Sequence, residues 1–389
     1  MIIYNKNWLL NKGIHEQITT AFKQHLITKE EKETLLNNYP IGFYSPNYFI
    51  RIGLGVLTLM VANFTLGFLG LLGSSFSENI TALLLVNGVI CYIGLEFMVR
   101  QNNHFSSGVD DMLLYMSSIF ILCGLCYNSS FNSRFSESII ALLCFAVTIL
   151  ASLRFTDRLT GVAAYVAFFA FIFYSYLQLG TIAKATMPFV VMLLSVAMYI
   201  LSIAIDKNPR WIHYHDCLSM IKILSLITFY AGGNYYVIRE LSNSMFQLHL
   251  KPTDSITLGW FFWLWTLVIP ILYLIKGVTK KERYFIHIGI ALFVASIATI
   301  RVYHQLLPIE VALLLAGSIL ISIGYGLMKY LETPKNNFTA LLIDDNKNFA
   351  NIEALIAVSV TSLTSKLRTQ NTTEFGGGSS GGAGATGNY

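Results

Sequence analysis

A first group of ionisable side chains interrupts the apolar sequence where the second long apolar stretch ends and the third begins. Its members are Glu96, Arg100, Asp110 and Asp111. Charged side chains are costly inside a membrane, so they are the usual indicators of function in a membrane protein. Glu96 precedes Arg100 by four residues, and a helix would bring the two together as an ion pair. The structural alternative is a network of salt bridges at the membrane interface.

A second group combines arginine with aromatic and other polar side chains at the ends of the later apolar stretches. It consists of Arg239, Trp260, Trp263, Arg301, His304 and Glu310. Arginine can bind an acidic headgroup through two hydrogen bonds and tryptophan offers a broad apolar wall, so the group predicts a pocket for an amphiphile. Gly232 and Gly233 loosen the preceding helix, and Pro270 frees the carbonyl of Thr266, so a kink could open a cavity. The alternative is an aromatic belt with snorkelling arginines.

The remaining reactive residues form no catalytic or metal-binding motif. The segment WIHYHDC at 211–217 carries potential zinc ligands, but alternate positions converge only in an extended chain, and no second ligand group lies nearby. Cys123 and Cys126 are spaced for a helix, where a disulfide is poorly placed, so we interpret them as packing residues. Phosphate-loop, dinucleotide, zinc-protease and serine-hydrolase motifs do not occur. We therefore expect no catalytic residue, no metal and no cofactor, and an enzyme is the least favoured class.

Ten apolar stretches must position these side chains. Apolar residues make up 54% of the 389 residues and charged residues 12%, with a mean hydropathy of +0.59. A helix that crosses a bilayer needs roughly 20 mostly apolar residues, and a membrane barrel would need alternation that these runs lack. The expected spans are 49–73, 80–99, 109–127, 136–153, 159–179, 183–205, 219–238, 255–276, 284–303 and 307–328. The pattern predicts an all-α, polytopic membrane helix bundle over 49–330.

Lysine and arginine collect on alternate connections between the stretches, which predicts the orientation. With the N-terminus inside, Arg100, Arg154 and Arg158 lie on inner connections, whereas the outer connections carry few basic residues. Both termini are then cytoplasmic, which requires an even number of spans. The net charge of +5 matches flanks that face anionic lipid. We therefore expect membrane lipids, and not nucleic acid, as partners.

The terminal segments are predicted to form cytoplasmic elements. Residues 1–48 have the pattern of an amphipathic helical hairpin, in which Asn11 caps the first helix and Thr28 with Glu31 forms a capping box. Residues 331–374 contain one amphipathic helix, and the Gly-rich residues 375–389 are expected to be disordered. No cleaved signal peptide is expected. The termini either bind a protein partner or pack against the membrane domain.

The hairpin sequence LNKGIHEQ, followed by YPIGFYSPNYFIRIGLGVLTL and many hydrophobic spans, resembles the predicted bacterial membrane proteins of the domain-of-unknown-function family numbered twenty-one fifty-seven. The resemblance is clearest over 9–73 and implies a bacterial inner-membrane protein, but the family has no established activity to transfer. We expect the later spans to bind or transport a small amphiphilic or lipid-like solute. The alternative is a membrane scaffold or signalling protein that acts through its terminal segments.

Overall fold

The fold is built from helices throughout the part of the chain that the structure, a computed structural model, describes. Those residues are 2–24, 26–72, 79–127, 136–246, 256, 258–303 and 309–330. Within them the β pairing is one isolated bridge between Tyr44 and His104. The predicted all-α class is therefore confirmed. The predictions for 331–374 and 375–389 lie outside the described residues.

The chain divides into two compact units, and the smaller one contains most of the N-terminal hairpin. Among the described residues, one unit comprises those up to Leu9 and those from Gly42 onward, and the other comprises Leu10–Ile41. The hairpin pairs α1 (Lys6–Lys23) with α2 (Lys29–Asn38). The two helices lie within the predicted segment, whose limits of 1–48 stay a prediction.

The hairpin has its own apolar core of Ile18, Ala21, Ile27 and Leu35. The predicted capping box is present, since Thr28 accepts a hydrogen bond from the backbone of Glu31 and the Glu31 carboxylate accepts one from the backbone of Thr28. Asn11 does not cap α1, which begins five residues earlier; its amide donates to the carbonyl of Pro40 at 2.8 Å. Asn11 thus ties the two ends of the hairpin together.

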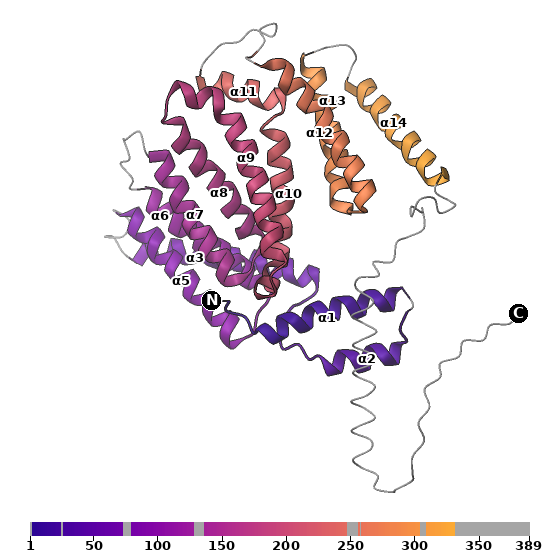
Figure 1. Cartoon of the computed structure of the whole chain (residues 1–389). Helices are drawn as coiled ribbons and strands as arrows, with labels where there is room; N and C mark the ends of the chain where they lie inside the picture. Colours follow the sequence, from indigo (N-terminus) through magenta and orange to yellow (C-terminus); the bar gives the residue numbers. More distant parts are fainter. Residues whose placement is uncertain are drawn as a thin grey trace, which may run out of the picture. The chain divides into compact units, whose positions relative to one another are not determined.

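The larger unit is a row of helices in which neighbours along the chain pack as pairs (Figure 1). The elements are α3 (Tyr48–Leu72), α5 (Ile80–Gln101), α6 (Val109–Tyr127), α7 (Ser136–Phe155), α8 (Arg158–Leu177), α9 (Thr181–Asp206), the 3-10 helix η1 (Pro209–Tyr214), α10 (His215–Ala231), α11 (Tyr235–Phe246), α12 (Gly259–Lys280), α13 (Arg283–Tyr303) and α14 (Ile309–Tyr330). The closest pairs are α5 with α6, α7 with α8, α9 with α10 and α12 with α13.

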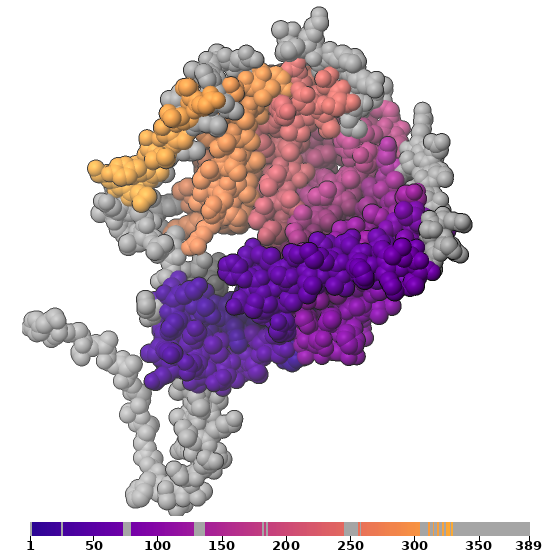
Figure 2. Space-filling model, turned by 180° about the vertical axis from the view of Figure 1, so that it is seen from behind, coloured from indigo at the N-terminus to yellow at the C-terminus, as the bar shows by residue number. Residues whose placement is uncertain are grey.

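Eight of these helices are long and apolar enough to cross a membrane, and a ninth span results if one bent pair counts as a single crossing, within the residues that were described. The protein is therefore an integral, multi-pass membrane protein. The bent pair, residues 209–231 and 235–244, replaces the predicted continuous span 219–238 and turns by 74°. The tenth predicted span coincides with α14, which lies beside α13 (Figures 1 and 2) but is not one of these eight helices, so the count of ten stays a prediction.

The break between α10 and α11 has a steric and a hydrogen-bonding cause. A Cβ atom on Gly233 would lie 2.2 Å from the indole of Trp265, so only glycine allows this close approach. The next residue, Asn234, accepts a hydrogen bond from the backbone N–H of Val237 at 3.2 Å and so caps the start of α11. The sequence analysis expected the two glycines to loosen the helix, but it predicted a span that continues through them.

Candidate functional site

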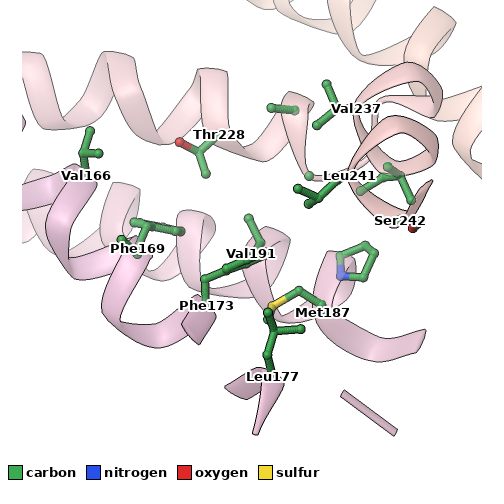
Figure 3. A pocket seen from close by; sticks show the side chains of 15 residues that line it. Val166, Phe169, Phe173, Leu177, Met187, Val191, Thr228, Val237, Leu241 and Ser242 are labelled. Atoms are coloured by element: carbon green, nitrogen blue, oxygen red, sulfur yellow. The ribbon is translucent and has the colours of Figure 1, made fainter. Parts of the chain in front are cut away.

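An apolar cavity of about 340 Å³ lies at the break between α10 and α11. Figure 3 shows its walls, to which α8 contributes Phe169 and Phe173, α9 contributes Val191, and α11 contributes Leu241. The volume falls within the usual range for a site that binds a small molecule. The cavity therefore has the size and the apolar wall expected of a site for a hydrophobic ligand.

Polar groups are few in this cavity and belong to the broken helix. Thr228 on α10 and Ser242 on α11 are the two lining residues that have hydroxyl groups (Figure 3). Gly232 also lines the cavity, and its N–H donates to the carbonyl of Thr228 at 2.8 Å. The break thus shapes the wall and sets a few polar atoms into an otherwise apolar surface, as irregular backbone at membrane depth commonly does where it lines a cavity.

The predicted outer group is brought together only in part. The ring of Trp263 stacks on Tyr235, with the centroids 4.6 Å apart. The guanidinium of Arg239 lies 4.7 Å from the ring centroid of Tyr303, and the Arg239 residue is 3% exposed. The Tyr303 hydroxyl donates to Glu240 at 3.1 Å. Three helices, α11, α12 and α13, therefore meet in an aromatic cluster that holds a buried arginine through a cation–π contact.

The other members of that group differ in exposure. Trp260 is 70% exposed, as expected of a side chain in an interface belt. Arg301 is half-buried on α13, Glu310 is exposed at the start of α14, and His304 lies outside the described residues. None of the six residues lines the cavity of about 340 Å³. A single pocket that contains all six stays a prediction.

Pro270 does free the carbonyl of Thr266, but the predicted opening does not follow. The hydroxyl of Ser296 on α13 donates to this carbonyl at 2.7 Å. The Thr266 hydroxyl accepts a hydrogen bond from the backbone N–H of Tyr235 at 3.0 Å. Pro270 leaves the Thr266 carbonyl without its helical partner, and the helix break does the same to the Tyr235 N–H. Both backbone groups thus bond to side chains of neighbouring helices.

These hydrogen bonds belong to a buried series of side-chain hydrogen bonds, in which each donor and acceptor can be assigned. The amide of Asn234 donates to the hydroxyl of Tyr230 at 2.8 Å, and the Tyr230 hydroxyl lies 3.0 Å from that of Ser296. Since the Ser296 proton is directed to a carbonyl, Tyr230 must donate to Ser296. Asn234 is 2% exposed. This hydrogen-bond network holds the break between α10 and α11 against α12 and α13. No sequence motif predicted it.

The four inner-group residues separate into two independent arrangements. The Glu96 carboxylate pairs with Arg100 at 3.0 Å, as predicted, and also with Arg154. The Tyr92 hydroxyl donates to the same carboxylate at 2.9 Å. Glu96 therefore joins α5 to the end of α7, a link that spacing along one helix could not reveal.

Asp110 and Asp111 do not join the Glu96 network. Asp111 pairs with Arg51 of α3 at 2.7 Å, whereas Asp110 is 3% exposed and accepts the N–H groups of Ser106 and Ser107 at 2.8 Å each. The Asp110 carboxylate thus holds the loop that precedes α6, and its position in the first turn of α6 interacts favourably with the helix dipole. The four side chains thus have different partners, and a function for them as one inner-face group stays a prediction.

The first residues of the chain complete this end of the larger unit. The Ile3 N–H donates to the carbonyl of Arg154 at 3.1 Å, and the Tyr4 ring packs edge-on against Phe43 and Phe105. Burial and the carboxylate of Asp110 raise the pKa of the Tyr4 hydroxyl above its usual value. Tyr4 is therefore an uncharged structural anchor at neutral pH.

The long apolar helices and their exposed apolar surfaces define a polytopic helical membrane protein in contact with lipid. Comparisons of the chain with protein-family models, with curated proteins and with solved structures found no match.

Proposed function

We propose that this protein binds, and moves across or within the membrane, a small amphiphilic or lipid-like solute that occupies the cavity between α8 and α11. The supporting observation is the apolar cavity of about 340 Å³ beside a broken membrane helix. Broken helices beside a site are a recurrent feature of membrane transporters. Thr228 and Ser242 supply hydrogen bonds for the polar part of such a solute.

The helix α11 is the element that would control access. Val237, Ile238 and Leu241 line the cavity from α11. Arg239 and Glu240, on the same helix, contact Tyr303 of α13. Movement of α11 would therefore open the cavity and break the contacts with α13 together.

Ligand binding to the purified full-length protein tests the proposal. The probe is palmitoyl lysophosphatidylethanolamine, and native mass spectrometry in detergent measures its dissociation constant. Val191→Phe fills the cavity and is expected to weaken binding about tenfold. Leu193→Phe, which changes a 76% exposed side chain on the same helix, serves as the matched control. Equal affinity of the wild type and both variants would refute a ligand site in this cavity.

The proposal includes a bacterial inner-membrane location, ten spans with both termini inside, and membership of the resembled family. The distribution of lysine and arginine supports the orientation. In a variant without the five native cysteines, an impermeant maleimide should label a cysteine introduced at Asn243 and not one at Asn208. The reverse labelling pattern would invert the orientation.

A scaffold or signalling role is the second candidate, and one observation favours it. Residues 10–41 belong to a separate compact unit with an apolar core and a capping box of their own. Deletion of 10–41 should then remove a copurifying protein partner while lysolipid binding is retained. Loss of lysolipid binding without loss of any partner would contradict this role.

A further inference from the structure

A second apolar cavity, of about 600 Å³, lies beside the first and on another side of α8. Its walls come from α6, α7 and α8, and include Ala141, Cys144 and Thr148 of α7. Val166 and Ala170 of α8 line both cavities. The two spaces therefore adjoin along one short stretch of α8.

The ridge that separates the cavities faces outward. The Val166 side chain is 56% exposed, although it lines both spaces, so both are accessible from the lipid around α8. The first cavity follows α8 from Val166 to Leu177, and the second follows it from Ala163 to Tyr174. Both thus follow the stretch of α8 from Val166 to Tyr174 and end near the C-terminus of that helix.

We propose that the ligand is a two-chain lipid that straddles α8, with one acyl chain in each cavity. This inference rests on the proposed function, because it specifies the ligand of the same site. Each cavity by itself has a volume suited to one small ligand or chain. The two acyl chains of one lipid are attached to the same headgroup, so they must enter the cavities side by side from one end. The two cavities follow the same stretch of α8, which meets that requirement.

The chemistry at the C-terminal end of α8 indicates the headgroup. Glu137 and Tyr174 line the second cavity, and the Gln178 amide donates to the Ser138 hydroxyl at 2.9 Å beside them. The Glu137 carboxylate favours a positive charge at this end of the cavity, where the C-terminus of α8 meets the N-terminus of α7 and the two helix dipoles oppose each other. The headgroup is therefore an amine-bearing one, as in phosphatidylethanolamine, and not the acidic headgroup that the arginines of the sequence predicted.

Selectivity for two chains must come from packing and from the headgroup. Lipid tails are as apolar as the protein surface, so transfer of a chain from the bilayer gains little hydrophobic free energy. An acyl chain that fits a cavity makes many dispersion contacts with its walls, and a lipid that lacks one of the two chains lacks all the contacts of that chain. A one-chain analogue should therefore bind more weakly than the two-chain lipid.

The test compares three probes on the purified full-length protein: dipalmitoyl phosphatidylethanolamine, dipalmitoyl phosphatidylglycerol and palmitoyl lysophosphatidylethanolamine. Native mass spectrometry gives the dissociation constants. Ala141→Phe fills the second cavity alone and should weaken the two-chain amine lipid about tenfold while leaving the lysolipid unchanged. Leu150→Phe, at a 59% exposed position of α7, is the control. The amine lipid should also bind more tightly than the glycerol lipid, and Glu137→Gln should reduce that preference.

The outcomes separate this inference from the proposed function. If Val191→Phe weakens every probe but Ala141→Phe weakens none, the first cavity binds a ligand and the two-chain inference is wrong. If neither variant has an effect, the proposed function itself fails. Because a phenylalanine at the buried Ala141 can impair folding, a phosphatidylethanolamine with a photoreactive diazirine in each chain provides a second measurement on the wild type. It should cross-link to peptides from both α7 and α11, and cross-links confined to α11 would overturn the inference.

Discussion

The hydroxyl of Ser296 should matter only because residue 270 is a proline. Pro270 has no N–H, so the Thr266 carbonyl lacks its usual helical partner and instead accepts the Ser296 hydroxyl at 2.7 Å. Ser296→Ala removes this donor and also removes the acceptor of the Tyr230 hydroxyl. In the double variant Pro270→Ala and Ser296→Ala, the restored N–H of residue 270 can bond the Thr266 carbonyl within α12.

The expected magnitudes follow from these partners. Hydrogen bonds between membrane helices average about 0.6 kcal/mol and reach about 1.7 kcal/mol. The Ser296 oxygen also lies 2.9 Å from the carbonyl of Leu292, so its single proton is shared and the Thr266 bond is worth less than the maximum. We expect Ser296→Ala to lower the free energy of unfolding by about 1–2 kcal/mol in the wild type and by about 0.6 kcal/mol in the Pro270→Ala background.

Equilibrium unfolding of the full-length protein by dodecyl sulfate in mixed micelles, followed by circular dichroism, measures the four free energies of this cycle. Ser195→Ala is the matched control, because the buried Ser195 hydroxyl bonds the Met192 carbonyl within its own helix at 2.7 Å. Its cost should be the same in both backgrounds. If Ser296→Ala also costs the same in both backgrounds, the carbonyl freed by Pro270 does not depend on Ser296 and the reasoning is refuted.

Two further predictions use the same unfolding measurement. Arg154→Gln should destabilise the protein by about 1.5 kcal/mol and Arg100→Gln by about 0.2–0.5 kcal/mol. Both arginines pair with the Glu96 carboxylate, but the Arg154 side chain is 32% exposed and the Arg100 side chain 62%. Equal costs of the two variants would contradict this ranking. Gly233→Ala should cost about 1–3 kcal/mol, since its Cβ would lie 2.2 Å from an indole ring, whereas Gly67→Ala, with open space around it, should be neutral or stabilising. A harmless Gly233→Ala would show that the helix break does not need glycine.

Local patterns in the sequence determined the class of the protein and much of its helical layout. Continuous apolar runs such as 284–303 predicted α13 within a residue at each end, because a helix in lipid must satisfy all its backbone groups internally. The capping box at Thr28 and the pair of Glu96 with Arg100 were also predictable, since each depends on residues three or four positions apart.

Tertiary structure decided whatever depends on residues far apart in the chain. The partners of Glu96 and Asp111 include Arg154 and Arg51, about 60 positions away, so helix spacing could not assign them. The cavities are bounded by side chains such as Phe169 and Val191, whose types are ordinary for any membrane helix. A cavity is space left between packed helices, and its place follows from how whole helices meet, for which a local pattern carries no signal.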